Sequence, residues 1–209
     1  MAAAQQFMAE LQASRPALAS ALGELAELHS RRLWHELTLK LEEVVAAPAF
    51  CAPGDDLLVR VFTHFVSDFA ERMNQLKLAH IAVAVSARLG EPSAAVAFLQ
   101  GVVVKMADQP RVEAPLLYMR THVALLHLQS GDLAAAKAGV DEGRAALDKL
   151  ADADSSVHAA VYFVAAQLAK AKQDFAEFYK TGMLYLAYVS AEALPDATKL
   201  VRARAVHQP

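Results

Sequence analysis

The chain has 209 residues and a formal net charge of −3 at pH 7, and it is 56% hydrophobic but only 7% aromatic. This net charge gives no indication of binding to nucleic acid or to an anionic membrane. The single cysteine, Cys51, excludes an internal disulfide and fits a reducing compartment. The N-terminal residues lack a secretory signal, and no apolar run reaches the roughly 18 residues that predict a membrane span, so we expect a soluble cytoplasmic or nuclear protein.

The sequence predicts helices throughout. Alanine favours helix, and β-branched residues form no long alternating run that would predict a strand. Ser14 and Asn74 are expected to cap helix N-termini, and Asp55 and Asp56 suit another helix start because their charge complements the helix dipole. In chain order the expected helices cover residues 3–13, 14–29, 31–47, 56–72, 74–89 and 93–106, followed by a hairpin and two further helices.

Apolar residues recur at helical spacing in each expected helix, and they predict the core. A ligand-stacking role for the aromatic residues among them is the weaker interpretation. The predicted core residues are Trp34, Leu37, Leu41, Val44, Leu58, Val61, Phe62, Phe65, Phe69, Leu78, Ile81, Val85, Leu89, Ala95, Leu99, Val102, Met106, Val157, Val161, Val164, Leu168, Phe175, Phe178, Gly182, Tyr185, Leu186 and Val189.

The central stretch, residues 116–150, predicts a helix hairpin. Gly131 can adopt a positive φ and end the first helix, and Asp132 can cap the second. Small residues on the inner face, Ala136 and Gly143, are expected to let the partner helix come close. Each helix of the hairpin has a line of inward-facing, mostly apolar residues, called its seam. The seams are Leu117, Thr121, Ala124, Leu125 and Leu128 before the turn, and Leu133, Ala136, Val140, Gly143, Leu147 and Leu150 after it.

Similar turns flank this hairpin. Gly90, Gly131 and Gln173 follow one another at intervals of 41 and 42 residues, close to the roughly 40 to 47 residues of HEAT-type helical arrays. The sequence therefore predicts an all-α fold of stacked antiparallel helical hairpins, a TPR-like or HEAT-like right-handed solenoid. A helical-repeat domain is expected over residues 1–195, with a tail over residues 196–209 that lacks a convincing apolar stripe.

No motif for catalysis, phosphate binding or paired metal ligands occurs. His122 and His127 are five residues apart and do not converge on one side of a helix. His64 with Asp68 and His158 with Tyr162 are each four apart, but surface or capping roles explain such pairs. Helix capping likewise explains Asp55 with Asp56, and Cys51 is interpreted as an ordinary cysteine. We therefore expect no catalytic, cofactor-binding or metal-binding residue.

Several strings, in order along the chain, resemble the family of the 26S proteasome non-ATPase regulatory subunit 13. The most specific is Leu33-Trp34-His35-Glu36-Leu37-Thr38-Leu39, and the similarity covers roughly residues 20–195. The further strings lie at residues 48–50, 54–57, 65–69 with Arg72, 131–133, 156–158, 179–180 and 194–195. After Pro195 the chain departs from the family's pattern.

The resemblance implies a non-catalytic scaffold subunit of the proteasome regulatory particle lid, which supports lid assembly in ubiquitin-dependent protein degradation. It implies other lid subunits as partners, with no nucleic acid, membrane, small-molecule substrate or cofactor. It also implies the N-terminal helical repeats of a PCI-family subunit, with the C-terminal PCI winged-helix half absent from this chain. An adaptor in another PCI-containing complex, of the signalosome or translation-initiation type, remains an alternative, as does a small helical enzyme.

The last expected helix is predicted to differ from the others in how its apolar face is covered. A stack of hairpins that ends at an internal repeat leaves an apolar end face. We therefore expect the helix from Phe175 to Val189 to be partly uncovered or capped by the tail, and the chain alone to be moderately stable and to self-associate.

Overall fold

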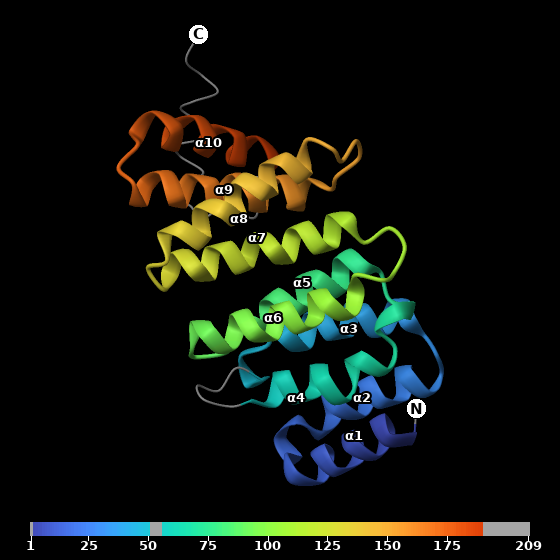
Figure 1. Ribbon diagram of the computed structural model, residues 1–209. Helices are drawn as coiled ribbons and strands as arrows, with labels where there is room; N and C mark the ends of the chain where they lie inside the picture. The colour runs from blue at the N-terminus through green and yellow to red at the C-terminus, as the bar shows by residue number, and fades with distance from the viewer. Residues whose placement is uncertain (1, 51–55, 190–209) are drawn as a thin grey trace. The chain divides into compact units, whose positions relative to one another are not determined.

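The structure is a computed structural model that describes residues 2–50 and 56–189 (Figure 1). All regular secondary structure within these residues is helical, which confirms the predicted all-α class. The chain divides into two compact units, Met1–Met119 and Arg120–Pro209.

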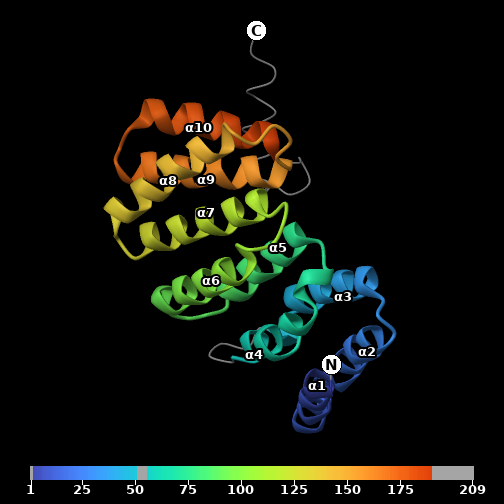
Figure 2. The same ribbon diagram turned by 45° about the vertical axis from the view of Figure 1, so that its right-hand side comes forward.

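The first unit is a succession of helices that pack on their neighbours in the chain (Figure 2). The contacts join α1 to α2, α2 to α3, α3 to α5 and α5 to α6, so each pair buries the apolar stripe of its members. The elements are α1 (Ala2–Ser14), η1 (Pro16–Leu18), α2 (Ala19–Ser30), α3 (Trp34–Ala46), η2 (Pro48–Phe50), α4 (Leu57–His64), η3 (Val66–Asp68), η4 (Ala70–Arg72), α5 (Gln75–Ser86), α6 (Pro92–Met106) and the first part of α7 (Glu113–Gln129).

The second unit holds the rest of α7, then α8 (Leu133–Leu147), α9 (Ser155–Ala171) and α10 (Phe175–Tyr188). Antiparallel α9 and α10 form a close hairpin, and α8 packs on α9. The core between α7, α8 and α9 is made of small and branched residues, namely Ala124, Ala136, Val140, Val164, Ala165 and Leu168. A Cβ added at Gly139 would lie 2.7 Å from the Cβ of Ala124, so α7 and α8 touch at this glycine.

Two hairpin turns share one geometry. Gly131 and Gln173 have φ values of 87° and 60°, and in each turn the next residue's N–H donates to the carbonyl oxygen five residues earlier, at 2.9 Å. That next residue then caps the following helix. Asp132 accepts from the Ala135 N–H at 2.9 Å, and Asp174 accepts from the Glu177 N–H at 3.0 Å. The predicted central hairpin and its cap are confirmed.

The predicted helix over residues 56–72 is broken into α4, η3 and η4. Its expected inward residues are nevertheless buried, including Phe65 and Phe69. The α-helix ends before Phe65, whose φ is −112°, and the backbone leaves the helical region at Phe69, whose φ is −132°. Both rings thereby reach the core, so burial of two aromatic side chains outweighs helix continuity.

The cap predicted at Ser14 is wrong. The Ser14 hydroxyl donates to the Leu11 carbonyl oxygen at 3.0 Å and so closes α1 instead of opening the next helix. Asp56 occupies the N-cap position of α4, as predicted from its charge and the helix dipole, although its side chain makes no capping bond. Asn74 does cap α5, because its side chain accepts from the N–H groups of residues 76 and 77. Asp55, Cys51 and residues 194–209 lie outside the described residues.

Other differences are smaller. The helix expected from residue 31 begins at Trp34, because Arg32 adopts a φ of 57° in the preceding turn. Leu133 is exposed although it continues the seam of α8. Ala136 and Gly143 are buried on the inner face as predicted, and a close contact that was not predicted occurs at Gly139.

Candidate functional site

The outer face of α10 carries the largest group of exposed apolar side chains in the described residues. Phe175 and Tyr179 are 73% and 69% exposed, and Phe178 and Met183 are 37% and 36% exposed. The sequence predicted Phe175 and Phe178 as core residues, which is wrong. The related prediction was that the helix from Phe175 to Val189 is partly uncovered or capped by the tail. These exposed side chains agree with the first alternative, and the tail lies outside the described residues.

The inner face of α10 is anchored on α9 by other residues. Thr181 is buried on this face, and its hydroxyl donates within α10 to the Glu177 carbonyl oxygen at 2.7 Å. Tyr185 packs on Phe163 of α9 with ring centroids 5.3 Å apart. The helix is therefore held in place without its exposed aromatic residues.

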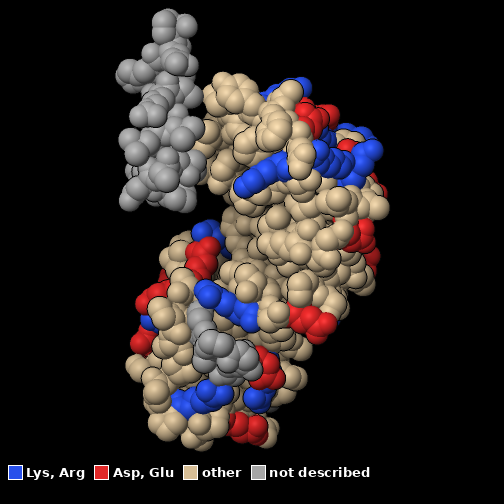
Figure 3. Space-filling model, turned by 90° about the vertical axis from the view of Figure 1, so that its left-hand side faces the viewer, with Lys and Arg blue, Asp and Glu red and all other residues tan. Residues whose placement is uncertain are grey.

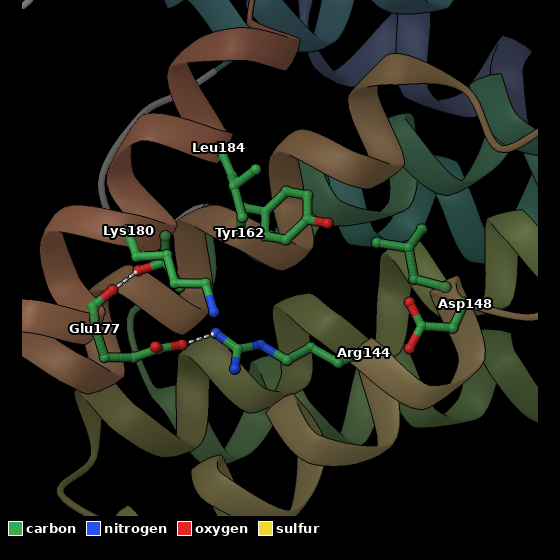
Figure 4. A pocket seen from close by; sticks show the side chains of 8 residues that line it. Arg144, Asp148, Tyr162, Glu177, Lys180 and Leu184 are labelled. Atoms are coloured by element: carbon green, nitrogen blue, oxygen red, sulfur yellow. Dashed lines mark hydrogen bonds and ion pairs between the residues drawn. The ribbon is translucent and has the colours of Figure 1, made fainter.

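A pocket of about 210 Å³ lies between α8, α9 and α10 (Figure 4). Arg144 from α8 donates through Nη2 to Glu177 Oε1 of α10 at 2.6 Å, a charge-assisted bond that joins the two helices. Lys180 extends toward this ion pair from the next part of α10, while Asp148 lies at the other end of the pocket. Among the described residues, Lys180 has no ion-pair partner.

An aromatic stack closes one side of the α9–α10 hairpin. The rings of His158 and Tyr188 are 4.4 Å apart and nearly parallel, and Tyr188 also stacks on Tyr162 at 5.7 Å. Burial raises the pKa of the Tyr162 hydroxyl above its ordinary value, with further increases from Tyr188 and Asp148. The predicted pair of His158 and Tyr162 thus shares a face, and its role is packing between helices.

The first unit has a larger cavity, of about 490 Å³. Phe62, Phe98 and Met106 form much of its apolar wall, and Lys105 and Glu71 also line it. The rings of Phe62 and Phe98 meet edge to face at 5.2 Å. The lining offers van der Waals contact and no converging set of acids, bases or nucleophiles.

A buried histidine was missed by the sequence analysis. His29 is fully buried, with its ring 5.1 to 5.8 Å from the rings of Trp34, Phe65 and Phe69. Its Nε2 lies 3.3 Å from Asp68 Oδ2. The angles of that contact do not make a hydrogen bond, and both ring nitrogens lack hydrogen-bond partners among the described residues. The spacing of His29 from Leu22 and Leu25, the buried residues of α2, was the available indication.

The other histidine pairs do not form a site. Asp68 contacts His29 rather than His64, and the His64 ring lies 5.2 Å from Phe7. No group of three or more His, Cys, Asp or Glu residues that could hold a metal ion occurs within residues 2–50 and 56–189. In that same part of the chain, no helix is both long and apolar enough to cross a membrane. On the face shown in Figure 3, Lys and Arg side chains alternate with Asp and Glu side chains, without a field of one sign among the described residues.

The family model and the similar proteins all point to one family. Residues 21–207 match the family described as PSD13 N-terminal repeats. The chain is 41% identical over 200 residues to the 26S proteasome non-ATPase regulatory subunit 13 homolog A of Arabidopsis thaliana, covering 95% of this chain and 51% of that protein. It is 40% identical, with the same coverage, to homolog B of Arabidopsis thaliana. Against the 26S proteasome non-ATPase regulatory subunit 13 of Dictyostelium discoideum it is 23% identical, covering 90% of this chain and 48% of that protein. The chain spans about half the length of the curated relatives it matches.

Proposed function

The chain belongs to the family of the 26S proteasome non-ATPase regulatory subunit 13, and from this membership we propose that it is a non-catalytic scaffold subunit of the proteasome regulatory particle lid. In this role it supports lid assembly for ubiquitin-dependent protein degradation, and its partners are other lid subunits in the cytoplasm and nucleus. The observation that carries the proposal is the family match over residues 21–207.

The surfaces of the structure support a role in binding other proteins rather than in catalysis. Stacked helical hairpins present extended faces, and such scaffolds bind other proteins. The cavity of the first unit has a largely apolar wall, and the pocket of the second is crossed by the Arg144–Glu177 ion pair. The relatives carry the description non-ATPase regulatory subunit, which also favours a non-enzymatic role without a cofactor. The family match supports the lid over an adaptor in another PCI-containing complex.

The test is gradient sedimentation of a native extract that contains the tagged chain, followed by affinity purification and quantitative mass spectrometry. We expect the chain in the heavy fractions together with lid subunits. A matched control replaces Val164, which is buried in the core of the second unit, with Asp. This variant should lose the association, because an unpaired charge in an apolar core disrupts the packing. Recovery of the unaltered chain only at the top of the gradient, without proteasome subunits, would refute the proposal.

A further inference from the structure

One end of the pocket between α8, α9 and α10 holds two cations and one carboxylate. Arg144 enters it from α8 and Lys180 from α10, and their side chains extend toward the same place beside Glu177 (Figure 4). Glu177 pairs with Arg144 at 2.6 Å, and no ion pair within the described part of the chain includes Lys180. The other charged residue of the lining, Asp148, lies at the opposite end of the pocket. One positive charge is therefore left without a counter-charge at the Glu177 end.

Arg144 also has a hydrogen-bond donor without an acceptor. A guanidinium carries N–H groups on three nitrogens, and the bond to Glu177 is made by Nη2. The Nε atom is buried, and residues 2–50 and 56–189 supply no hydrogen-bond partner for it. A buried N–H of a charged group is costly to leave unpaired, so an acceptor is expected beside it. The orphaned Nε therefore points to an oxygen atom that comes from outside the described residues.

The pocket has room for a small anionic group. Its volume is about 210 Å³, whereas one water molecule occupies about 30 Å³ in the liquid, so a carboxylate or a phosphate group fits. Leu147, Leu184 and Tyr162 add apolar surface to the lining. Charges beside such walls are screened less by solvent and salt than charges on an open surface. An anion in this pocket would therefore be held more strongly than on the open surface of a helix.

We propose that this pocket binds one anionic oxygen group, a carboxylate or a phosphate, that accepts hydrogen bonds from Arg144 Nε and Lys180 Nζ. Arginine and lysine are the usual donors to such groups, and both bonds would be charge-assisted. The bond from Arg144 to Glu177 is retained, because Nη2 and Nε are separate donors. The group comes either from another molecule or from the chain's own Glu192 and Asp196, which follow α10 in the sequence.

The test is an NMR titration of the full chain, made with isotope-labelled arginine, with inorganic phosphate as the probe and chloride at equal ionic strength as the reference. The Nε–H signal of Arg144 is identified by its absence in Arg144→Lys, which keeps a cation beside Glu177. We expect phosphate, but not chloride, to shift this signal until it saturates. Lys180→Gln should weaken phosphate binding at least about threefold, because one charge-assisted hydrogen bond is lost. The matched control, Lys170→Gln on the exposed end of α9, should bind phosphate like the unaltered chain.

A variant with both Glu192→Gln and Asp196→Asn identifies the source of the group. If the chain's own carboxylates fill the pocket, this variant should bind phosphate at least about threefold more tightly than the unaltered chain, because a tethered competitor is removed. If the group comes from another molecule, the two proteins should bind phosphate equally. Both results support the site. The inference is overturned if phosphate shifts the signal in neither protein, if chloride shifts it equally, or if Lys180→Gln binds phosphate as tightly as Lys170→Gln; a water molecule beside Nε would then suffice. The proposed function is tested separately, by recovery of lid subunits.

Discussion

Protonation of His29 is expected to destabilise the first unit at acidic pH. The side chain is fully buried among three aromatic rings, and burial lowers its pKa below the ordinary value of 6.5, by more than the nearby Asp68 raises it. The folded unit therefore holds His29 neutral at a pH where the unfolded chain binds a proton. The sign follows from linkage, because stability rises with pH wherever the unfolded state binds more protons. The contribution of neutral His29 is present above pH 6.5 and is lost progressively below it.

The expected size follows from the proton uptake of one group. Between pH 7.5 and pH 5.5, a histidine that titrates near 6.5 in the unfolded chain and has a lowered pKa in the folded unit lowers the free energy of unfolding by at most about 1.4 kcal/mol. The matched variant is His29→Phe, which keeps an aromatic ring among Trp34, Phe65 and Phe69 and removes the titration.

Urea denaturation followed by Trp34 fluorescence is the assay. Trp34 is the single tryptophan of the chain, and its ring stacks on Phe69 and contacts the His29 ring, so its emission reports unfolding of this cluster. We expect the unaltered chain to lose more stability than His29→Phe over this pH range, by up to about 1.4 kcal/mol. Equal losses in both proteins would refute the reasoning. So would a gain in stability of the unaltered chain at pH 5.5, which would mean that the contact with Asp68 holds a protonated His29.

Three further substitutions test the packing of the second unit, each by thermal denaturation. Gly139→Ala should cost about 1–3 kcal/mol because its Cβ would lie 2.7 Å from that of Ala124, whereas Gly23→Ala, with open space around it in α2, should be neutral or stabilising. Asp174→Ala should cost about 1 kcal/mol through loss of the α10 cap, and Asp174→Asn should retain most of the stability. Gly131→Ala should cost about 1 kcal/mol, since the turn holds a φ of 87°, and an unchanged melting temperature would contradict that reason.

The sequence predicts best what depends on neighbours in the chain. The turn at Gly131 and the caps Asp132 and Asn74 follow from local chemistry, since a positive φ and an N-terminal acceptor each favour one residue type. The apolar spacing also identified Phe65 and Phe69 as core residues.

Features that depend on tertiary contacts escaped prediction. The chain breaks its helix at Phe65 and Phe69, because the space available in the core, not local propensity, decides where those rings go. Burial of His29 depends on the rings that surround it, two of which come from segments distant in sequence. The contact at Gly139 likewise depends on where Ala124 lies on the other helix.

The error at α10 has a different cause, and it bears on function. Periodicity shows which side chains share a face, but it does not show whether another helix covers that face. In this unit, the type of residue distinguishes the covered faces from the uncovered one. The core between α7, α8 and α9 consists of alanine, valine and leucine, which allow close approach, whereas α10 leaves Phe175, Phe178, Tyr179 and Met183 exposed. Large side chains of this kind serve as anchors in protein interfaces, and the pocket beside them holds the free charge of Lys180. The residues that build the core of this unit are therefore smaller than those that α10 leaves exposed.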